Sequence, residues 1–271
     1  MGDLPKVYPG CQGVVKDEIS LKNGYNLVVI PAKAGMTSKV DFSCVIVLLL
    51  HYNTKPGRTS FFNSYYRNKN MSDITGIILA GGRGKRLGYR NKALLEIGGK
   101  QIIQRIIETL SEVTDRIMIM TNFPEDFTHL EFPTFSDIIP NSGPLGGIYT
   151  GLKITKTQYN IILACDMPFI QPFILNKIID NIEDYDIIVP VTPDGYHPTT
   201  AIYSKNCLDT IEKQIQSGHL KISSIFSQLK VKAIEFAKIH DDNNLLVFFN
   251  VNTHKDYMKA VDMVEKDNLV F

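Results

Sequence analysis

The sequence predicts an α/β domain with a doubly wound, mostly parallel sheet of the Rossmann-like kind. After Met71, apolar runs of strand length alternate with amphipathic segments of helix length. That alternation is typical of a parallel sheet covered by helices on both faces. The first of these runs, Ile74–Leu79, leads directly into a glycine-rich loop. Hydrophobic residues make up 44% of the 271 residues and charged residues 21%, which is a globular composition and not a disordered one.

Each element after Met71 is predicted from its own pattern. Residues 101–113 place apolar side chains on one face at helical spacing. Pro172 marks a helix start, because the first helical turn needs no proline N–H. Thr253, with Asp256 three residues on, is close to a capping box. The predicted strands are Ile74–Leu79, 116–120, Tyr159–Ala164 and 187–190, and the predicted helices are 101–113, 145–154, 172–183, 207–216 and one that begins at Thr253.

The chain before Met71 differs from the rest in charge and in pattern. Residues 1–70 carry nine Lys/Arg and four Asp/Glu, a balance of +5, whereas residues 71–271 have a balance of −4. Short apolar runs occur there, at 27–30 and 45–50, but no amphipathic segment of helix length. So little periodicity would bury only a small core. We therefore predict a poorly ordered N-terminal extension of unknown role over 1–70, with a small appended domain or partner-binding arm as the alternative, and a main domain over 71–271.

Charge and cysteine usage exclude several classes of protein. The 29 Lys+Arg balance 28 Asp+Glu, so no overall basic field favours nucleic acid or a membrane surface as a partner. No apolar run approaches the roughly 20 residues of a membrane-spanning helix. The four cysteines form no C-x-x-C pair, which argues against a disulfide framework or a structural zinc site. We expect a cytoplasmic enzyme or binding domain.

A glycine-rich, basic loop follows the first predicted strand. Its glycines let backbone N–H groups turn inward and approach an anion closely. Its five cations within ten residues suit a triphosphate better than a single carboxylate. The loop therefore predicts a phosphate site at the carboxyl end of the strand, where ligands of such sheets bind. Its sequence is Leu79-Ala80-Gly81-Gly82-Arg83-Gly84-Lys85-Arg86-Leu87-Gly88-Tyr89-Arg90-Asn91-Lys92.

Two common phosphate loops fit this sequence poorly. A Walker A loop needs Ser or Thr after Gly-Lys, but Arg86 follows Gly84-Lys85. A dinucleotide fingerprint needs G-x-G-x-x-G at the start of a helix, and the glycine spacing here is one residue too long. The acidic residue expected at the end of the next strand is also missing, because that strand ends in Thr121-Asn122.

Four stretches, in order, resemble the molybdenum cofactor guanylyltransferase family of nucleotidyltransferases. The resemblance covers the chain from about Ile74 to its C-terminus and leaves residues 1–70 outside. The stretches are Leu79-Ala80-Gly81-Gly82 with Arg86-Leu87-Gly88 and Lys92-Ala93-Leu94-Leu95, then Asp137-Ile138-Ile139 with the turn Gly143-Pro144-Leu145-Gly146-Gly147-Ile148, then Cys165-Asp166-Met167-Pro168-Phe169, and finally Asn250-Val251-Asn252-Thr253.

The resemblance implies a Rossmann-like nucleotidyltransferase that uses Mg²⁺ to transfer GMP from GTP to molybdopterin and releases pyrophosphate. Attack of one phosphate on another brings two anions together, so the site needs positive charge and positioning. Gly82 after Gly81 favours GTP. The alternatives are a related enzyme that uses CTP or another phosphorylated acceptor, and a non-catalytic nucleotide-binding protein. The partners implied are GTP, molybdopterin and, transiently, molybdenum-insertion or molybdoenzyme-maturation proteins.

The resemblance also assigns roles to individual residues. Lys92 and Asp166 would be catalytic, Lys92 by neutralising phosphate charge and Asp166 as the Mg²⁺ ligand. A turn or cap before Pro168 is the alternative for Asp166. Asn250 and Asn252 would contact molybdopterin, or else form a turn before the last helix. The residues implied to contact GTP are Leu79, Ala80, Gly81, Gly82, Arg86 (with Arg83 and Lys85 as rivals), Lys92, Asn122, Asp137 (alternatively an ordinary loop aspartate) and Asp166.

Two residues near these motifs stand apart from the catalytic set. Asn91 occupies the position before Lys92 where the family usually carries an aspartate; an amide keeps a hydrogen bond there but not a charge. His197, followed by Pro198, falls where the family places an acceptor-side loop, but a lone histidine in a polar loop is typically exposed to solvent. We predict no catalytic role for His197.

Overall fold

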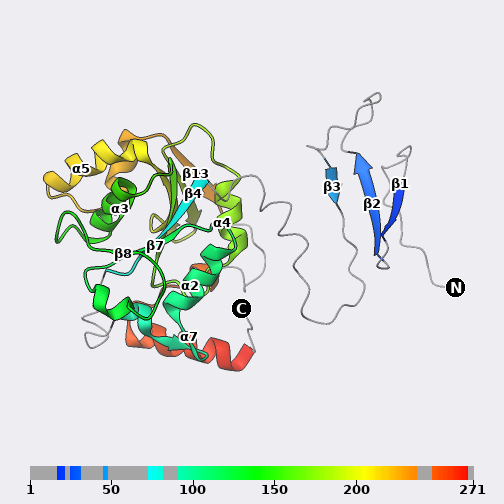
Figure 1. Ribbon diagram of the computed structural model, residues 1–271, viewed down its shortest axis with the longest axis horizontal. Helices are drawn as coiled ribbons and strands as arrows, with labels where there is room; N and C mark the ends of the chain where they lie inside the picture. Colours follow the sequence, from blue (N-terminus) through cyan, green and yellow to red (C-terminus); the bar gives the residue numbers. More distant parts are fainter. Residues whose placement is uncertain are drawn as a thin grey trace. The chain divides into compact units, whose positions relative to one another are not determined.

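The computed structural model describes residues 17–21, 25–31, 45–47, 73–81, 91–236 and 246–267. The chain divides into two units, Met1–Thr59 and Ser60–Phe271. The first unit contains an antiparallel sheet in the order β1-β2-β3 (Figure 1). Its strands are β1 (Asp17–Leu21), β2 (Tyr25–Pro31) and β3 (Val45–Val47). The boundary at residue 70 and the poor order of the extension stay predictions.

The second unit is built on a mixed, mostly parallel sheet in the order β11-β10-β12-β9-β4-β7-β8, with β13 paired to β10. The strand β4 lies between β7 and β9 and is parallel to both. Leu79 lies opposite Met120 on one side and Ala164 on the other, so three carboxyl ends coincide. The strands are β4 (Ile74–Leu79), β7 (Ile117–Met120), β8 (Thr134–Phe135), β9 (Tyr159–Ala164), β10 (Ile187–Thr192), β11 (Gly195–Tyr196), β12 (Thr200–Ser204) and β13 (Val231–Glu235).

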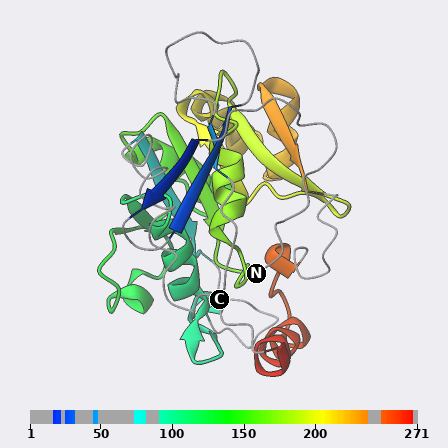
Figure 2. The same cartoon turned by 90° about the vertical axis from the view of Figure 1, so that its right-hand side faces the viewer.

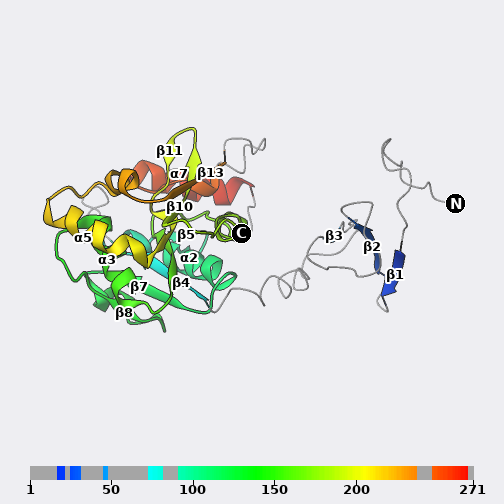
Figure 3. The ribbon, with the colours of Figure 1, turned by 90° about the horizontal axis from the view of Figure 1, so that it is seen from above.

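Helices cover both faces of this sheet, which confirms the doubly wound α/β prediction. Along β4, Ile74 and Ile78 pack into one core with α2, α4 and α7, whereas Ile77 and Leu79 pack into a second core with α3 and α5. The helices α3 and α5 lie side by side in Figures 1 and 3. The helices are α2 (Ile102–Ser111), α3 (Gly143–Ile154), α4 (Pro172–Ile179), α5 (Leu208–Gln216) and α7 (His254–Asp267).

Short elements connect these layers. A hairpin of β5 (Glu96–Ile97) and β6 (Lys100–Gln101) precedes α2. The Tyr257 hydroxyl on α7 donates to the Glu96 carbonyl at 2.9 Å, and Figure 2 shows α7, in red, beside the hairpin. The 3₁₀ helices are η4 (Lys92–Leu94), η5 (Pro124–Phe127), η6 (Lys205–Cys207), η7 (Ile222–Gln228) and η8 (Leu246–Phe248).

Most predicted elements agree with the structure to within a few residues. The helix predicted over 172–183 ends at Ile179, because Asn181 and Ile182 N–H groups bond three residues back in a tighter turn. The sequence did not predict β12 or β13. β12 runs antiparallel to β9 and β10, which makes the sheet mixed. In the described part of the chain, no helix is long and apolar enough to cross a bilayer.

The helix α3 packs very close to β4 because two glycines face the strand. A Cβ atom at Gly147 would lie 2.9 Å from the Leu79 side chain, and one at Gly151 would lie 2.7 Å from that of Ile77. The stretch that begins at Gly143, expected as a turn, forms the first turns of α3, with Pro144 where the helix needs no N–H. The N-terminus of α3 therefore lies near the carboxyl ends of β4 and β7.

Candidate functional site

The candidate site lies where β4, β7 and β9 end together. Sheet pairing continues one residue past the strands, because Ala80 N donates to Met120 O at 2.8 Å and Cys165 N donates to Leu79 O at 3.1 Å. These bonds fix the backbone from which the following residues project. Ligands of open α/β sheets bind beyond this edge. Those predicted site residues that the structure describes either follow the strands of this edge or lie on segments packed against them.

Asp166 places a carboxylate directly after the end of β9. One of its oxygens, Oδ1, is buried and has no hydrogen-bond partner among the described residues. Burial raises the pKa of the Asp166 carboxyl, and the nearby Lys92 ammonium opposes this shift. A buried, unpaired carboxylate oxygen is costly unless a cation or donor meets it. Its position is therefore suited to a ligand that brings positive charge.

A magnesium ion fits this carboxylate. The described residues contain no group of three or more His, Cys, Asp or Glu side chains arranged to hold a metal by themselves. Mg²⁺ typically takes only one or two protein carboxylates and completes its shell with water and substrate phosphates. The one oxygen of Asp166 that is buried without a hydrogen-bond partner among the described residues would fit that type of site.

Among the described residues, Lys92 places an ammonium group in the candidate site. It begins η4, and its ammonium donates to Asn252 Oδ1 at 2.9 Å, which joins positions 160 residues apart. The same ammonium opposes the raised pKa of Asp166 and contributes to the lowered pKa of Asp256, whose largest cause is the hydrogen bond with Thr253. Lys92 therefore lies close enough to both carboxylates to affect their charge.

The segment before α7 is held against Asp166. Val251 N donates to the Asp166 carbonyl at 2.7 Å. Asn252 N and Thr253 N both donate to Asp256 Oδ2, at 3.1 and 2.8 Å, and Asp256 N donates to Thr253 Oγ1 at 3.2 Å. The predicted capping box is thus confirmed. Its effect at the site is to hold Asn252 where its amide oxygen reaches Lys92.

Asn250, the other residue expected on the acceptor side, has a local contact. Its amide donates to the Phe248 carbonyl, two residues earlier, at 3.2 Å. The amide oxygen of Asn252 instead accepts a hydrogen bond from the Lys92 ammonium, which is distant in the sequence. The two asparagines therefore contribute differently, although both belong to the segment that packs on Asp166.

Asn122 and Asp137 form a reciprocal pair at the end of β7. The Asn122 amide donates to Asp137 Oδ2 at 3.0 Å, and Asp137 N donates to Asn122 Oδ1 at 3.1 Å. Cβ atoms built on Gly146 and Gly147 would lie 3.6 Å from the Asp137 carboxylate, so this group lies over the first turn of α3. Burial raises the pKa of Asp137, and the Asn122 hydrogen bond opposes the shift. The pair places a second carboxylate on the same edge of the sheet.

Only the first three residues of the glycine loop, Leu79, Ala80 and Gly81, and its last two, Asn91 and Lys92, belong to the described residues. Leu79 and Ala80 are buried in the two cores, so only their backbone atoms can approach a ligand. Gly81 is exposed with open space around it. The remaining loop residues predicted to bind phosphate, Gly82 and Arg86 with the rivals Arg83 and Lys85, lie outside the described residues.

Two features near the site were missed or misjudged from sequence. His197 is not an exposed loop histidine: its ring packs on Phe248 with centroids 4.4 Å apart, and Nε2 lies 2.9 Å from Thr192 Oγ1. Burial lowers the pKa of this imidazole. Asn91 donates through its amide to Asp126 Oδ2 at 3.0 Å. No local pattern signals Asp126, because its partner lies 35 residues away.

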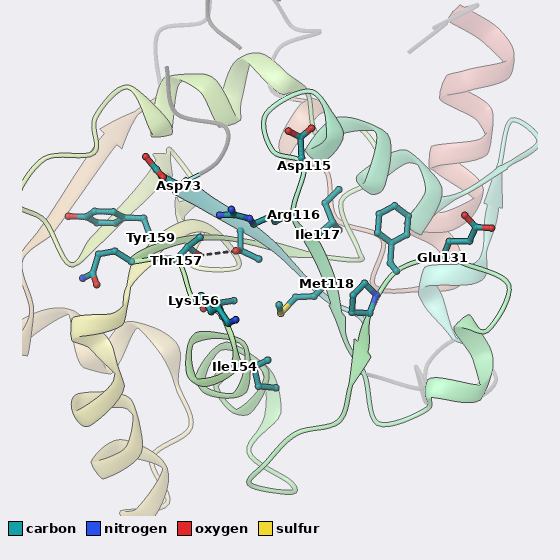
Figure 4. Close-up of a pocket in the computed structure, with 15 residues that line it drawn as sticks. Asp73, Asp115, Arg116, Ile117, Met118, Glu131, Ile154, Lys156, Thr157 and Tyr159 are labelled. Atoms are coloured by element: carbon teal, nitrogen blue, oxygen red, sulfur yellow. Dashed lines mark hydrogen bonds between the residues drawn. The ribbon is translucent and has the colours of Figure 1, made fainter. Parts of the chain in front are cut away.

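A large cavity lies at the opposite edge of the sheet, at the amino ends of β4, β7 and β9 (Figure 4). Its volume is about 1020 Å³. The hydroxyls of Thr75 and Thr157, 2.8 Å apart, satisfy each other in its wall. None of the predicted site residues lines this cavity. Cavity size therefore does not mark the edge at which the charged groups converge.

This chain is similar in sequence to several known proteins. The sequence matches the family described as MobA-like NTP transferase domain over residues 76–233. Molybdenum cofactor guanylyltransferase of Desulfosudis oleivorans is 35% identical over 192 residues, covering 70% of this chain and 95% of that protein. A probable molybdenum cofactor guanylyltransferase of Clostridium perfringens is also 35% identical, over 196 residues, covering 71% of this chain and 96% of that protein.

Solved structures show the same fold. Molybdopterin-guanine dinucleotide biosynthesis protein A of Archaeoglobus fulgidus has a TM-score of 0.63 and 25% identity, and the match covers 71% of this chain and 99% of that one. A CMP:2-keto-3-deoxy-manno-octonic acid synthetase complexed with CTP has a TM-score of 0.58 and 13% identity, with coverage of 72% and 100%. At that identity the second likeness concerns the fold alone.

Proposed function

Because the chain belongs to the MobA-like NTP transferase family and is a nucleotidyltransferase of molybdenum cofactor biosynthesis, we propose that it transfers GMP from GTP to molybdopterin. The acceptor is bare or already carries molybdenum, and pyrophosphate is released. The observation that carries the proposal is the buried Oδ1 of Asp166, which has no hydrogen-bond partner in the described part of the chain and lies near the Lys92 ammonium. A carboxylate beside a triphosphate is repulsive unless a cation lies between them, so this oxygen supports a metal–nucleotide ligand.

The charged and polar residues of the candidate site have separate roles in this reaction. Asp166 holds Mg²⁺, which when bound neutralises phosphate charge and orients the reacting groups. Lys92 contacts the phosphates and stabilises the negative charge that develops as pyrophosphate leaves. Asp137 and Asn122, paired at the end of β7, contact the nucleotide or its metal. Gly81, which is exposed, is proposed to offer its backbone N–H to the phosphates, and Gly82 and Arg86 are proposed to contact them as the resemblance implies.

The acceptor enters on the side of the segment that precedes α7. Asn252 contacts Lys92, so an acceptor phosphate near this amide would also lie near the positive charge. Asparagine amides can pair with the donor and acceptor edge of a pterin, which is the role we propose for Asn250 and Asn252. The described cysteines, Cys165 and Cys207, are buried and free, and a cytoplasmic location is part of the same proposal. A transient contact with molybdenum-insertion or molybdoenzyme-maturation proteins remains a prediction.

The preference for the guanine base is tested by comparing four nucleoside triphosphates. GTP, CTP, ATP and UTP are titrated at one Mg²⁺ concentration, and GTP is expected to bind more tightly than CTP because Gly82 follows Gly81. Equal or inverted affinities would favour the related enzyme that uses CTP. Pyrophosphate release with molybdopterin then distinguishes an enzyme from a non-catalytic nucleotide-binding protein. Binding of GTP without pyrophosphate release would overturn the proposed reaction.

A further inference from the structure

We propose that Asn91 and Asp126 form a matched amide–carboxylate pair that positions Lys92. The inference deepens the proposed function and rests on it, because the residue being positioned is the lysine that meets the phosphates. Both members of the pair lie outside the set of site residues that sequence motifs indicate. The pairing is visible first in the hydrogen bonds of Asn91.

Asn91 holds the start of the 3₁₀ turn to which Lys92 belongs. The residue is buried, with 8% of its surface exposed. Its side-chain Oδ1 accepts from Ala93 N at 3.2 Å, and its main-chain carbonyl accepts from Leu94 N at 3.1 Å. Asn91 is therefore the N-cap of η4, and the direction in which Lys92 leaves the backbone depends on it.

The amide of Asn91 has one chemically sensible orientation. Because the Ala93 N–H can only donate, the oxygen of the Asn91 amide must face it. The NH₂ group then faces Asp126 Oδ2 at 3.0 Å. An amide donor against a carboxylate is complementary, and the hydrogen bond is strengthened by the charge. The Asn91 side chain thus accepts a hydrogen bond from the η4 turn through its oxygen and donates one to the Asp126 carboxylate through its NH₂ group.

Asp126 connects this turn to the end of a neighbouring strand. It lies in η5, which follows β7 and Asn122. Phe127, the next residue, is 1% exposed and packs in the core, which anchors η5. The pair therefore ties the backbone of Lys92 to the carboxyl end of β7, while Asn252 holds the ammonium at the other end of the side chain.

An aspartate in place of Asn91, the residue type that the resemblance predicts, would not suit this neighbour. One oxygen of the new carboxylate would still accept from Ala93 N, but the other would face the Asp126 carboxylate at hydrogen-bond distance. Two carboxylates so close repel unless they share a proton. The turn would then have to shift, and Lys92 with it. Combining Asn91→Asp with Asp126→Asn exchanges the two side chains and restores one amide against one carboxylate.

The test compares four full-length proteins: the wild type, Asn91→Asp, Asp126→Asn and the double exchange. For each, kcat and KM for GTP are measured by pyrophosphate release with molybdopterin, and affinity for inorganic tripolyphosphate is measured with Mg²⁺. Asn91→Asp is expected to lower kcat/KM on the order of 10–100-fold, because a displaced Lys92 no longer meets the phosphates. Asp126→Asn should stay within a few-fold of the wild type, since two amides still pair. The double exchange should recover most of the loss.

The control is Asn176→Asp, which adds the same charge at an exposed position on α4 and should leave both measurements unchanged. Thermal unfolding of each protein is recorded in parallel. The inference is overturned if Asn91→Asp matches the wild type, if the double exchange is no better than Asn91→Asp, or if only the unfolding temperature changes. An inactive wild type would instead overturn the proposed function, and the tripolyphosphate affinities would still decide whether the pair positions Lys92.

Discussion

The two edges of the main sheet differ in how their polar groups are satisfied. At the amino edge, beside a cavity of about 1020 Å³, the buried groups pair with one another: Thr157 Oγ1 donates to Asn160 Oδ1 at 2.9 Å and lies 2.8 Å from Thr75 Oγ1. At the carboxyl edge, Asp166 keeps a buried oxygen without a partner among the described residues. Among the described residues, the buried polar groups of the amino edge are paired, whereas one carboxylate oxygen at the carboxyl edge is not.

Among the described residues, the candidate site is therefore distinguished by an unpaired buried carboxylate oxygen, while the cavity of about 1020 Å³ lies at the opposite edge. Folding tends to leave few buried polar atoms unpaired, so an exception requires an explanation. Besides Asp166 Oδ1, one other described side-chain atom is of this kind, Arg105 Nε, on a guanidinium whose Nη2 donates to the Ile97 carbonyl at 2.6 Å. Of these two described residues, Asp166 alone combines the missing partner with a nearby lysine and the carboxyl ends of parallel strands.

The largest effect should come from Asp166→Asn. Loss of the metal ligand is expected to lower pyrophosphate release at least a thousandfold, which corresponds to about 4 kcal/mol of transition-state stabilisation. The Asp166→Asn variant should fold normally. Burial raises the pKa of Asp166, so the ionised form is disfavoured in the folded state, and a neutral amide should raise the unfolding temperature at pH 7. That gain should vanish below the ordinary carboxyl pKa, where the group is protonated in both states.

A second variant distinguishes the contribution of the metal to GTP binding from that of the lysine. Lys92→Ala should weaken GTP binding by about 10–100-fold even without Mg²⁺, because a hydrogen bond to a charged group contributes about 1.5–3 kcal/mol. Asp166→Asn should weaken binding only when Mg²⁺ is present. Near-normal turnover of folded Asp166→Asn at low Mg²⁺ would show that the aspartate is a cap, and the contrast between the edges would lose its meaning.

A substitution at the amino edge should change the stability of the protein and not its activity. Thr157→Val removes the hydroxyl that joins Thr75 to Asn160 and leaves buried groups unpaired. We expect the free energy of unfolding to fall by about 1–3 kcal/mol, measured by urea denaturation, with kcat/KM unchanged. Thr157→Ser keeps the hydroxyl and is the matched control. A loss of activity in stably folded Thr157→Val would mean that both edges serve the reaction.

The smallest effect is expected from removing residues 1–70. Both edges belong to one unit of the chain, and the family match begins at residue 76. A protein that starts at Met71 should therefore unfold cooperatively at nearly the same temperature and bind GTP with affinity within about twofold. Calorimetry and nucleotide titration check this. Insoluble protein, or a broad unfolding transition, would show that the N-terminal segment is part of the core.

The sequence by itself determined the layered fold and predicted the edge of the sheet at which the candidate site lies. The strands Ile74–Leu79 and Tyr159–Ala164 were predicted with the bounds they have, because a buried strand is a short apolar run and a covering helix has its own period. The residues after those strands were expected at one edge for the same reason. Both inferences depend on patterns only a few residues long, which is the range over which a sequence is directly informative.

Only the tertiary structure decided which distant residues meet. The contact of Lys92 with Asn252 spans 160 positions, and that of Asn91 with Asp126 spans 35. The antiparallel entry of β12 beside β9 also follows from no local pattern. Such pairings are set when two cores pack on opposite faces of one sheet and fix each loop relative to its neighbours. The identity of a residue states what it can bond, but packing of the whole chain determines its partner.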